Sequence, residues 1–265
     1  MRKEIFSQNE YHTPEHAPRY VLDRLMIDSR LVFMSLFGKI ILRTRREALL
    51  GIYDTQHWID SSHEIFTNIE RCGGRFHITG LDHVRNSRGP VIILSNHMST
   101  LETMIFPGII QPIKDVTFVV KDELVRHWAF GAVMRSRQPI VLSRSNPRED
   151  FQIVMNQGFE LLQKGISIIV FPQSTRMTRF QPSEFNTLGS KLASRAGVHI
   201  IPVAIKTDFW GNGRFTGYLG PLDRRKPIHF AFGEPMFISG NGKEEHRIVI
   251  DFIQEHLARW TSDKS

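Results

Sequence analysis

The segment SNHMSTLE, residues 95–102, places a histidine and a carboxylate five residues apart. An imidazole titrates near neutral pH, so His97 can act as a general base. A carboxylate helps such a base by fixing its tautomer and by stabilising the imidazolium that forms. Within one regular helix the two side chains would lie ~140° apart, so Glu102 can reach His97 only if His97 lies in the turn before the helix.

Glu102 also has a purely structural explanation. Ser99-x-x-Glu102 is a capping-box pattern, in which Ser99 is the N-cap and Glu102 is the third helical residue. His97 alone is equally compatible with a hydrogen-bonded histidine at the end of a strand. The sequence therefore leaves two roles open for Glu102, a helix cap and the partner of a catalytic base.

Basic and hydroxyl-bearing residues follow three further apolar runs. The segment FPQSTR, residues 171–176, follows one run, and Arg144 and Lys121 each follow another. Hydroxyl and backbone N–H donors together with a bidentate guanidinium suit a phosphate group. Each segment alone would pass for a surface turn or a solvated charge. Three basic residues at the ends of parallel strands, however, would converge on one edge of a sheet.

The elements that must position these residues alternate along the chain after Gly80. Short apolar runs are separated by helical patterns of some ten residues, which predicts an α/β domain with a mainly parallel central sheet flanked by helices. The expected strands are residues 91–94, 117–120, 139–142, 167–171, 199–205 and 228–232. One expected helix begins at Ser99. The others cover residues 124–134, 151–163, 188–196 and 251–260. Sites in such domains lie at the carboxyl ends of the strands.

The N-terminal part of the chain has a different pattern. Residues 1–18 are polar and proline-containing, which indicates a loose lead-in. Apolar residues then recur at helical spacing over residues 19–50 and 58–69, and three arginines at positions 43, 45 and 46 end the first pattern. Two interpretations stay open: a helical hairpin packed on the core, or a basic-flanked amphipathic pair on a membrane surface.

We divide the chain into a helical membrane-docking region, residues 1–72, and one further domain, residues 73–265. The first twenty residues lack an apolar core and a small-residue cleavage site, so they do not resemble a signal peptide. The most apolar stretch, residues 31–42, would span ~18 Å as a helix against ~30 Å of hydrocarbon. We therefore expect no simple transmembrane helix, but a peripheral membrane protein on the cytoplasmic face.

Composition narrows the classes of function. The 265 residues are 41% hydrophobic and 23% charged, values that exclude wholesale disorder. The single cysteine, Cys72, excludes an intrachain disulfide and a zinc site built from cysteines, and a reducing compartment is the natural interpretation. The net charge of +7 favours a polyanionic partner, such as nucleic acid, an anionic membrane or a phosphorylated substrate.

Four segments, taken in order, resemble the blocks shared by glycerolipid acyltransferases related to 1-acylglycerol-3-phosphate acyltransferase. The first two are Asn96-His97-x-x-x-x-Glu102, similar to N-H-x-x-x-x-D, and a lysine and glycine region from Lys121 to Gly131 followed by a strand ending at Arg144. The other two are FPQSTR, residues 171–176, similar to F-P-E-G-T-R, and IPVAI, residues 201–205, similar to V-P-V-x-I. Order and gaps match over about residues 75–210, and the N-terminal helical pair resembles the membrane-docking helices of some members.

The resemblance implies that an acyl chain moves from a thioester donor, acyl-CoA or acyl carrier protein, to a lysophospholipid hydroxyl, such as that of 1-acylglycerol-3-phosphate. His97 would be the general base, Glu102 would orient it, and Arg176 would bind the acceptor phosphate. The implied substrate-binding residues are Lys121, Arg144, Gln173, Ser174, Thr175 and Arg176. Neither a metal nor a bound cofactor is implied. The partners would be the two substrates, an anionic membrane surface and, if it carries the donor, acyl carrier protein.

Two positions depart from the family pattern. Glu102 replaces the usual aspartate, and Gln173-Ser174 replaces the usual Glu-Gly pair. These departures support a second hypothesis, a catalytically weakened relative that binds lipid at the membrane surface. A nucleic-acid-binding module would explain the charge, but no recognised motif for one is present, so no nucleic acid is expected as a partner. A serine hydrolase using Ser99 or Ser174 would lack a G-x-S-x-G elbow.

Overall fold

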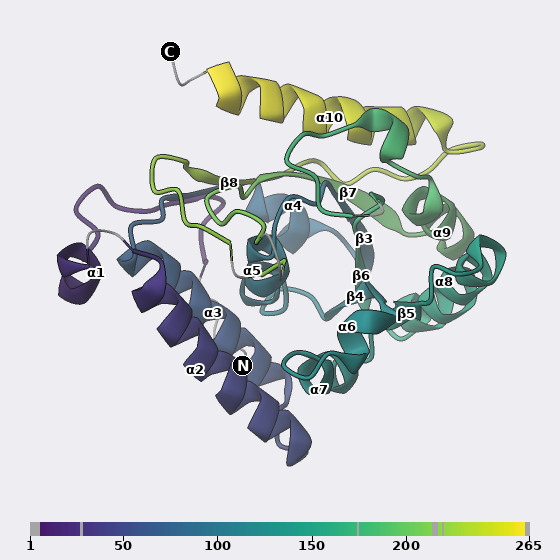
Figure 1. Ribbon diagram of the computed structural model, residues 1–265. Helices are drawn as coiled ribbons and strands as arrows, with labels where there is room; N and C mark the ends of the chain where they lie inside the picture. Colours follow the sequence, from purple (N-terminus) through teal and green to yellow (C-terminus); the bar gives the residue numbers. More distant parts are fainter. Residues whose placement is uncertain (1–5, 27–28, 174, 214–216, 219, 263–265) are drawn as a thin grey trace.

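A central sheet crosses the molecule. The computed structural model describes residues 6–26, 29–173, 175–213, 217–218 and 220–262. Within these residues the strands are β1 (Tyr11–His12), β2 (Phe76–Thr79), β3 (Val91–Ser95), β4 (Val116–Lys121), β5 (Ile140–Leu142), β6 (Ser167–Val170), β7 (His199–Lys206) and β8 (Ile228–Phe232). Their order in the sheet is β1-β2-β8-β7-β3-β6-β4-β5 (Figure 1). Only the β1–β2 and β7–β8 pairs among these described strands are antiparallel. The prediction of a mainly parallel α/β sheet is confirmed.

Helices cover both faces of the sheet, because successive strand residues point to opposite faces and both sets are apolar. Ile93 and Ile201 face one apolar cluster, whereas Ile92 and Ile200 face the other. The first cluster packs against α2 (Leu31–Leu49), α3 (Thr55–Arg71) and α5 (Leu101–Ile110), and the second against α8 (Pro147–Gln163), α9 (Leu188–Ala196) and α10 (Lys243–Ser262). Figure 1 shows α10 on the side of the sheet opposite α2 and α3.

The N-terminal helical patterns fold as α1 (Val21–Leu25), α2 and α3. Phe33 on α2 and Ile59 on α3 are completely buried. Asp54 caps α3 by accepting a hydrogen bond from the His57 N–H at 2.9 Å. The inner faces of α2 and α3 thus form a packed hairpin. The outer face of α2 is exposed. Membrane docking by this region and the division of the chain after residue 72 remain predictions.

Part of the segment 1–18, which was expected to be a loose lead-in, forms a strand at the edge of the sheet. Tyr11 and His12 form β1 and pair with β2. The Tyr11 hydroxyl donates a hydrogen bond to Glu70 on α3 at 2.7 Å, which ties this edge to the helix beneath it. β2 and the short helix α4 (Leu81–Asn86) were not predicted from the sequence. β1 and β2 lack the continuous apolar run that identified strands of similar length, such as β5 and β6.

The helix expected over residues 124–134 is broken. It forms α6 (Asp122–Arg126) and α7 (Gly131–Ser136), joined by four extended or turn residues. A Cβ at position 131 would lie 2.4 Å from the Val125 carbonyl oxygen, so the sharp reversal requires glycine there. The connecting loop carries Trp128, whose side chain is 68% exposed.

A row of ionisable side chains crosses the strands β7, β8, β2 and β1. Lys206, His229, His77 and His12 are in register on these neighbours. The His229 ring stacks on His77 at 4.9 Å and on Trp260 of α10 at 4.6 Å between ring centroids. Burial lowers the pKa of His77, and the neighbouring charge of His12 lowers it further. The neutral form of His77 is thus favoured.

Acid should destabilise the fold through His229. Burial, and then the charges of His77 and Lys206, lower its pKa from 6.5 to about 3. The unfolded chain therefore takes up a proton at higher pH than the folded chain. This contribution to stability is complete above the unfolded pKa and is lost as the pH falls from 6.5 towards 3.

We expect the Tm to fall on acidification, and to fall less in His229→Phe, which keeps a ring against Trp260. His16→Phe, at an exposed histidine, is the matched control. Parallel curves of Tm against pH for the native and His229→Phe proteins would contradict this assignment.

Candidate active site

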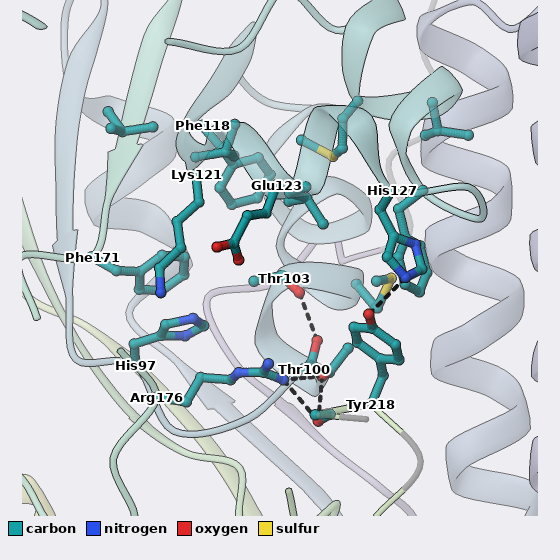
Figure 2. Close-up of a pocket in the computed structure, with 18 of the residues that line it drawn as sticks. His97, Thr100, Thr103, Phe118, Lys121, Glu123, His127, Phe171, Arg176 and Tyr218 are labelled. Carbon is teal, nitrogen blue, oxygen red and sulfur yellow. Dashed lines mark hydrogen bonds between the residues drawn. The ribbon is translucent and has the colours of Figure 1, made fainter. Parts of the chain in front are cut away.

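His97 lies in the turn between β3 and α5, as the sequence required for a contact with Glu102. Its Nδ1 is 2.8 Å from Glu102 Oε1, and its ring stacks on Phe171 with the centroids 4.3 Å apart. The His97 side chain is 17% exposed and points into a cavity (Figure 2). Because the carboxylate accepts from Nδ1–H, the network favours the tautomer with an unprotonated Nε2 facing the cavity.

Glu102 is the centre of a closed hydrogen-bond network. Its Oε1 accepts from His97 Nδ1 and from the backbone N–H groups of Met98 and Ser99, at 2.7 to 2.8 Å. Its Oε2 accepts from the hydroxyls of Ser99 and Thr207, at 2.9 and 2.6 Å. The carboxylate therefore caps the loop before α5 and also holds the imidazole. Glu102 thus has both a capping contact and the contact with His97, but the expected capping box is wrong in position: α5 begins at Leu101 with Thr100 as its N-cap, so Glu102 is the second helical residue.

The electrostatics of Glu102 fit an ionised partner for His97. The side chain is completely buried, and burial alone would raise its pKa. The hydrogen bond and charge of His97, followed by the bonds from Thr207 and Ser99, outweigh burial, so the pKa of Glu102 is lowered. A buried carboxylate held in its charged form can stabilise an imidazolium on His97.

Asn96 and Gln173 fix the backbone around His97. The Asn96 amide donates to the Ile205 carbonyl and accepts from the Ile205 N–H, both at 2.9 Å, and so continues the β3–β7 ladder beyond the end of β3. Gln173 Oε1 accepts from the His97 N–H at 2.9 Å. The Gln173 side chain is 1% exposed, and its Nε2 has no hydrogen-bond partner among the residues that the structure describes. A carboxylate in place of this amide would keep the acceptor and remove that donor.

Three basic side chains converge beside His97, as their positions after parallel strands predicted. Lys121, Arg144 and Arg176 all line the cavity that His97 faces. Burial lowers the pKa of Lys121, and the positive charges of Arg144 and Arg176 lower it further, while Glu123 opposes them. Among the described residues, the side chains of Lys121 and Arg144 have no ion-pair partner within 4.0 Å, so their charge is available to an anion.

Arg144 lies in a strained turn directly after β5. Its φ of 58° lies in the left-handed region, which few residues other than glycine adopt. Asp150, in the first turn of α8, holds this turn by accepting from the backbone N–H groups of Ser143 and Arg144, at 3.0 and 2.8 Å. Such strain persists only where surrounding contacts enforce it, and it is concentrated at functional sites.

Arg176 is held more firmly than its sequence position suggests. Its Nη1 donates to the Thr100 hydroxyl at 2.6 Å and to the Gly217 carbonyl at 2.8 Å (Figure 2). A Cβ at position 217 would lie 2.2 Å from Arg176 Nη2, so a larger residue there would displace the guanidinium. Arg176 therefore joins the loop after β6 to the segment after β7, in addition to facing the cavity.

The cavity has a volume of about 670 Å³ and is lined by polar residues from the loops after the strands and by apolar residues from α2, α3, α6 and α7. The polar lining includes His97 and the three basic residues. Tyr218 also lines the cavity and donates to or accepts from His127 Nε2 at 2.7 Å. The apolar lining includes Ile40, Tyr53, Trp58, Leu124, Phe130 and Met134. This volume and lining suit an elongated ligand with one anionic end and an apolar remainder.

Comparisons with known proteins agree with this geometry. The family model described as Acyltransferase matches residues 75–206, which contain the His97 turn and all three basic strand ends. The chain belongs to this acyltransferase family.

Curated relatives of this acyltransferase carry related names. It is 29% identical over 193 residues to the 1-acyl-sn-glycerol-3-phosphate acyltransferase of Pseudomonas aeruginosa, covering 72% of this chain and 69% of that protein. It is 30% identical over 144 residues to a probable 1-acyl-sn-glycerol-3-phosphate acyltransferase of Mycoplasma pneumoniae, covering 53% of this chain and 50% of that protein. The chain thus spans about two thirds of the first relative's length and half of the second's.

A solved structure matches the fold of the acyltransferase over almost its whole length. The crystal structure of the 1-acyl-sn-glycerophosphate (LPA) acyltransferase PlsC from Thermotoga maritima gives a TM-score of 0.62 at 18% identity, covering 92% of this chain and 94% of that chain. Because the match extends beyond residues 75–206, the N-terminal helices belong to the shared fold.

Most of the predicted site residues of the acyltransferase meet at the cavity, with Glu102 directly behind His97. Gln173 and Thr175 line the cavity wall, while Ser174 lies outside the described residues. Several residues that contribute to the site were not predicted from the sequence. Thr207 follows β7 and was detectable only as a polar residue at a strand end, and Glu123, His127 and Tyr218 carried no pattern that marked them.

Proposed function

We propose that this acyltransferase moves a fatty acyl chain from a thioester donor to the free hydroxyl of 1-acylglycerol-3-phosphate or a related lysolipid. The observation that carries the proposal is the buried His97–Glu102 pair, which opens onto a cavity lined by basic and by apolar side chains. The names of the curated relatives support the same acceptor class. The donor is acyl-CoA or acyl carrier protein, since either presents the thioester that the reaction consumes.

In the proposed mechanism, His97 Nε2 takes the proton of the acceptor hydroxyl as its oxygen attacks the thioester carbonyl carbon. Glu102 keeps the proton of Nδ1 in place and stabilises the imidazolium. Collapse of the tetrahedral intermediate breaks the carbon–sulfur bond and forms the ester. The departing thiolate takes the proton back from His97 Nε2, so the base is regenerated and the products are the acylated lipid and a free thiol.

The part of the cavity beside His97 would hold the acceptor phosphate. Lys121 and Arg144 lie there without an ion-pair partner among the described residues, and Arg176 presents the rest of its guanidinium beside them. Phosphate is recognised well by such a group of charged donors, because N–H bonds to an anion are shorter and stronger than neutral ones. The apolar lining would then receive a hydrocarbon chain.

The N-terminal helices would place this site at a membrane surface. Among the described residues, no helix is both long and apolar enough to span a bilayer. The exposed outer face of α2, with Lys39 and Arg46, supports contact with an anionic lipid surface. A lysolipid could then pass from the membrane to His97.

One assay tests the proposed function against its alternatives. Purified protein is given an acyl thioester with and without lysophosphatidic acid, and both free thiol and acylated lipid are measured. Thiol release that requires the acceptor, together with lipid product, supports the transferase. Thiol release without acceptor indicates a hydrolase. Lysolipid binding without turnover indicates the catalytically weakened relative.

The phosphate site gives a quantitative prediction. Lys121→Ala and Arg176→Ala should each raise the KM for lysophosphatidic acid by roughly 10- to 100-fold, because a hydrogen bond to a charged group contributes on the order of 1.5–3 kcal/mol. The KM for the acyl donor should change little. Initial rates with each substrate varied in turn would measure both constants.

Arg148→Ala, at an exposed arginine on α8 outside the cavity, is the matched control. If the KM values for donor and acceptor rise equally, the basic cluster does not select the acceptor. If neither rises, the phosphate is bound elsewhere.

A further inference from the structure

The exposed large apolar side chains of the described residues are concentrated at one end of the molecule. Nine of the thirteen lie on or next to α1 and α2: Val21, Leu22, Leu25, Met26, Leu31, Leu42, Leu49, Leu50 and Ile52. Exposure of one such side chain is normal in a folded protein, but a group of them marks a surface that contacts an apolar partner. Trp128, on the catalytic part of the chain, is also exposed, to 68%.

The outer face of α2 arranges its apolar residues in one line. At 100° per residue, Leu31, Leu42 and Leu49 lie within ~20° of each other around the helix. Lys39 and Arg46 flank this line on one side, and Arg45 flanks it on the other. The buried residues of α2, including Phe33 and Ile40, occupy the opposite face. An apolar line with cations on both flanks is the pattern of a helix that lies in an anionic lipid surface.

Trp128 adjoins this line although it is some eighty residues further along the chain. Arg45 Nε donates to the Trp128 carbonyl at 2.8 Å, which holds the α6–α7 loop against the flank of α2. Figure 1 shows α7 near the C-terminal end of α2. The neighbours His127 and Ala129 turn inward to line the cavity, whereas the indole of Trp128 points out to solvent. The loop therefore presents a cavity wall on one side and an exposed indole on the other.

We propose that Trp128 is an interfacial anchor, which inserts into the surface of an anionic bilayer and fixes the catalytic part of the chain there. Indole side chains favour the membrane interface because they combine a large apolar ring with one polar N–H. Lipid is a better occupant than a protein partner, because the apolar line is narrow and is bordered by Lys39, Arg45 and Arg46. The inference rests on the proposed function, since the substrate delivered to the cavity is a lipid.

Tryptophan fluorescence gives a direct test with the full chain. Trp58 and Trp210 are buried, and Trp260 packs against His229, so Trp128 is the indole whose surroundings change at a membrane. With vesicles of phosphatidylcholine and phosphatidylglycerol, emission should shift to shorter wavelength and be quenched by lipids brominated near the head of the acyl chains. Trp128→Ser should abolish both effects, and vesicles of phosphatidylcholine alone should produce much smaller ones.

Co-sedimentation measures the energetic contribution. Trp128→Ser should weaken binding to the anionic vesicles about tenfold, which corresponds to ~1.4 kcal/mol. Phe237→Ser is the matched control, because Phe237 is 58% exposed but lies between β8 and α10, away from the N-terminal helices. It should bind the vesicles like the native protein.

Native vesicle affinity in Trp128→Ser would overturn the anchor, and so would an unquenched Trp128 in vesicle-bound protein. A dimer in solution that dissociates in Trp128→Ser would also overturn it, because the occupant of this surface would then be a second copy of the chain. Turnover of short-chain, monomeric substrates is measured in parallel and should survive Trp128→Ser. If the native protein transfers no acyl group, the proposed function fails, while the vesicle data still decide the anchor.

Discussion

Replacing His97 by alanine should lower the kcat of acyl transfer by ~10²–10⁴-fold, the typical effect of losing a positioned general base. The imidazole is the one group in the described part of the site that pairs with a buried carboxylate and presents a free ring nitrogen to the cavity. Its removal also takes away the stacking contact with Phe171, at 4.3 Å, but that contact lies at the cavity wall. We therefore expect a folded protein with a nearly native Tm and little transfer.

Two controls make the His97 experiment decisive. His16→Ala changes an exposed histidine far from the cavity and should keep native turnover. Binding of lysophosphatidic acid to His97→Ala, followed by calorimetry, should stay close to native, because in our proposal other residues bind the phosphate. Native turnover in a purified, folded His97→Ala protein would refute the mechanism, and the acyl transfer would then need another base.

The catalytic edge of the sheet was predictable from sequence because its physical basis is simple. The four parallel strands β3, β4, β5 and β6 were all expected as short apolar runs, and the carboxyl ends of parallel strands lie at one edge of a sheet. His97, Lys121, Arg144 and Arg176 each follow such a run, so their convergence required only the topology. The expected strand limits agree with the observed ones to within about two residues, the usual uncertainty of boundaries.

Contacts made by residues distant in sequence were not predictable. Thr207 donates to Glu102 across 105 positions of the chain, and Gly217 accepts from Arg176 across 41. Neither pair has a spacing that a sequence pattern could reveal. The break between α6 and α7 depends on the approach of Gly131 to the Val125 carbonyl, which is a property of packing and not of helical propensity. These are also the contacts that shape the cavity around the predicted residues.

Replacing Glu102 by glutamine should lower kcat strongly, on the order of 10²–10⁴-fold, and leave the Tm almost unchanged. The amide oxygen can take the place of Oε1 and keep the bonds from His97, Met98 and Ser99. The amide nitrogen would replace Oε2, and the hydroxyls of Ser99 and Thr207 can rotate to accept from it. Shape and capping are thus retained, whereas the charge that stabilises an imidazolium is lost.

The matched variant for Glu102→Gln is Thr207→Val, which removes a 2.6 Å bond to Oε2 but leaves the charged pair with His97 intact. It should reduce kcat much less than Glu102→Gln, with a larger loss of Tm, because a buried acceptor loses its donor. Glu102→Asp restores the family's usual residue and should keep partial activity if the turn before α5 moves to close the shorter reach. Full turnover in Glu102→Gln would show that the carboxylate acts only as a cap, because the amide preserves every contact except the one that depends on charge.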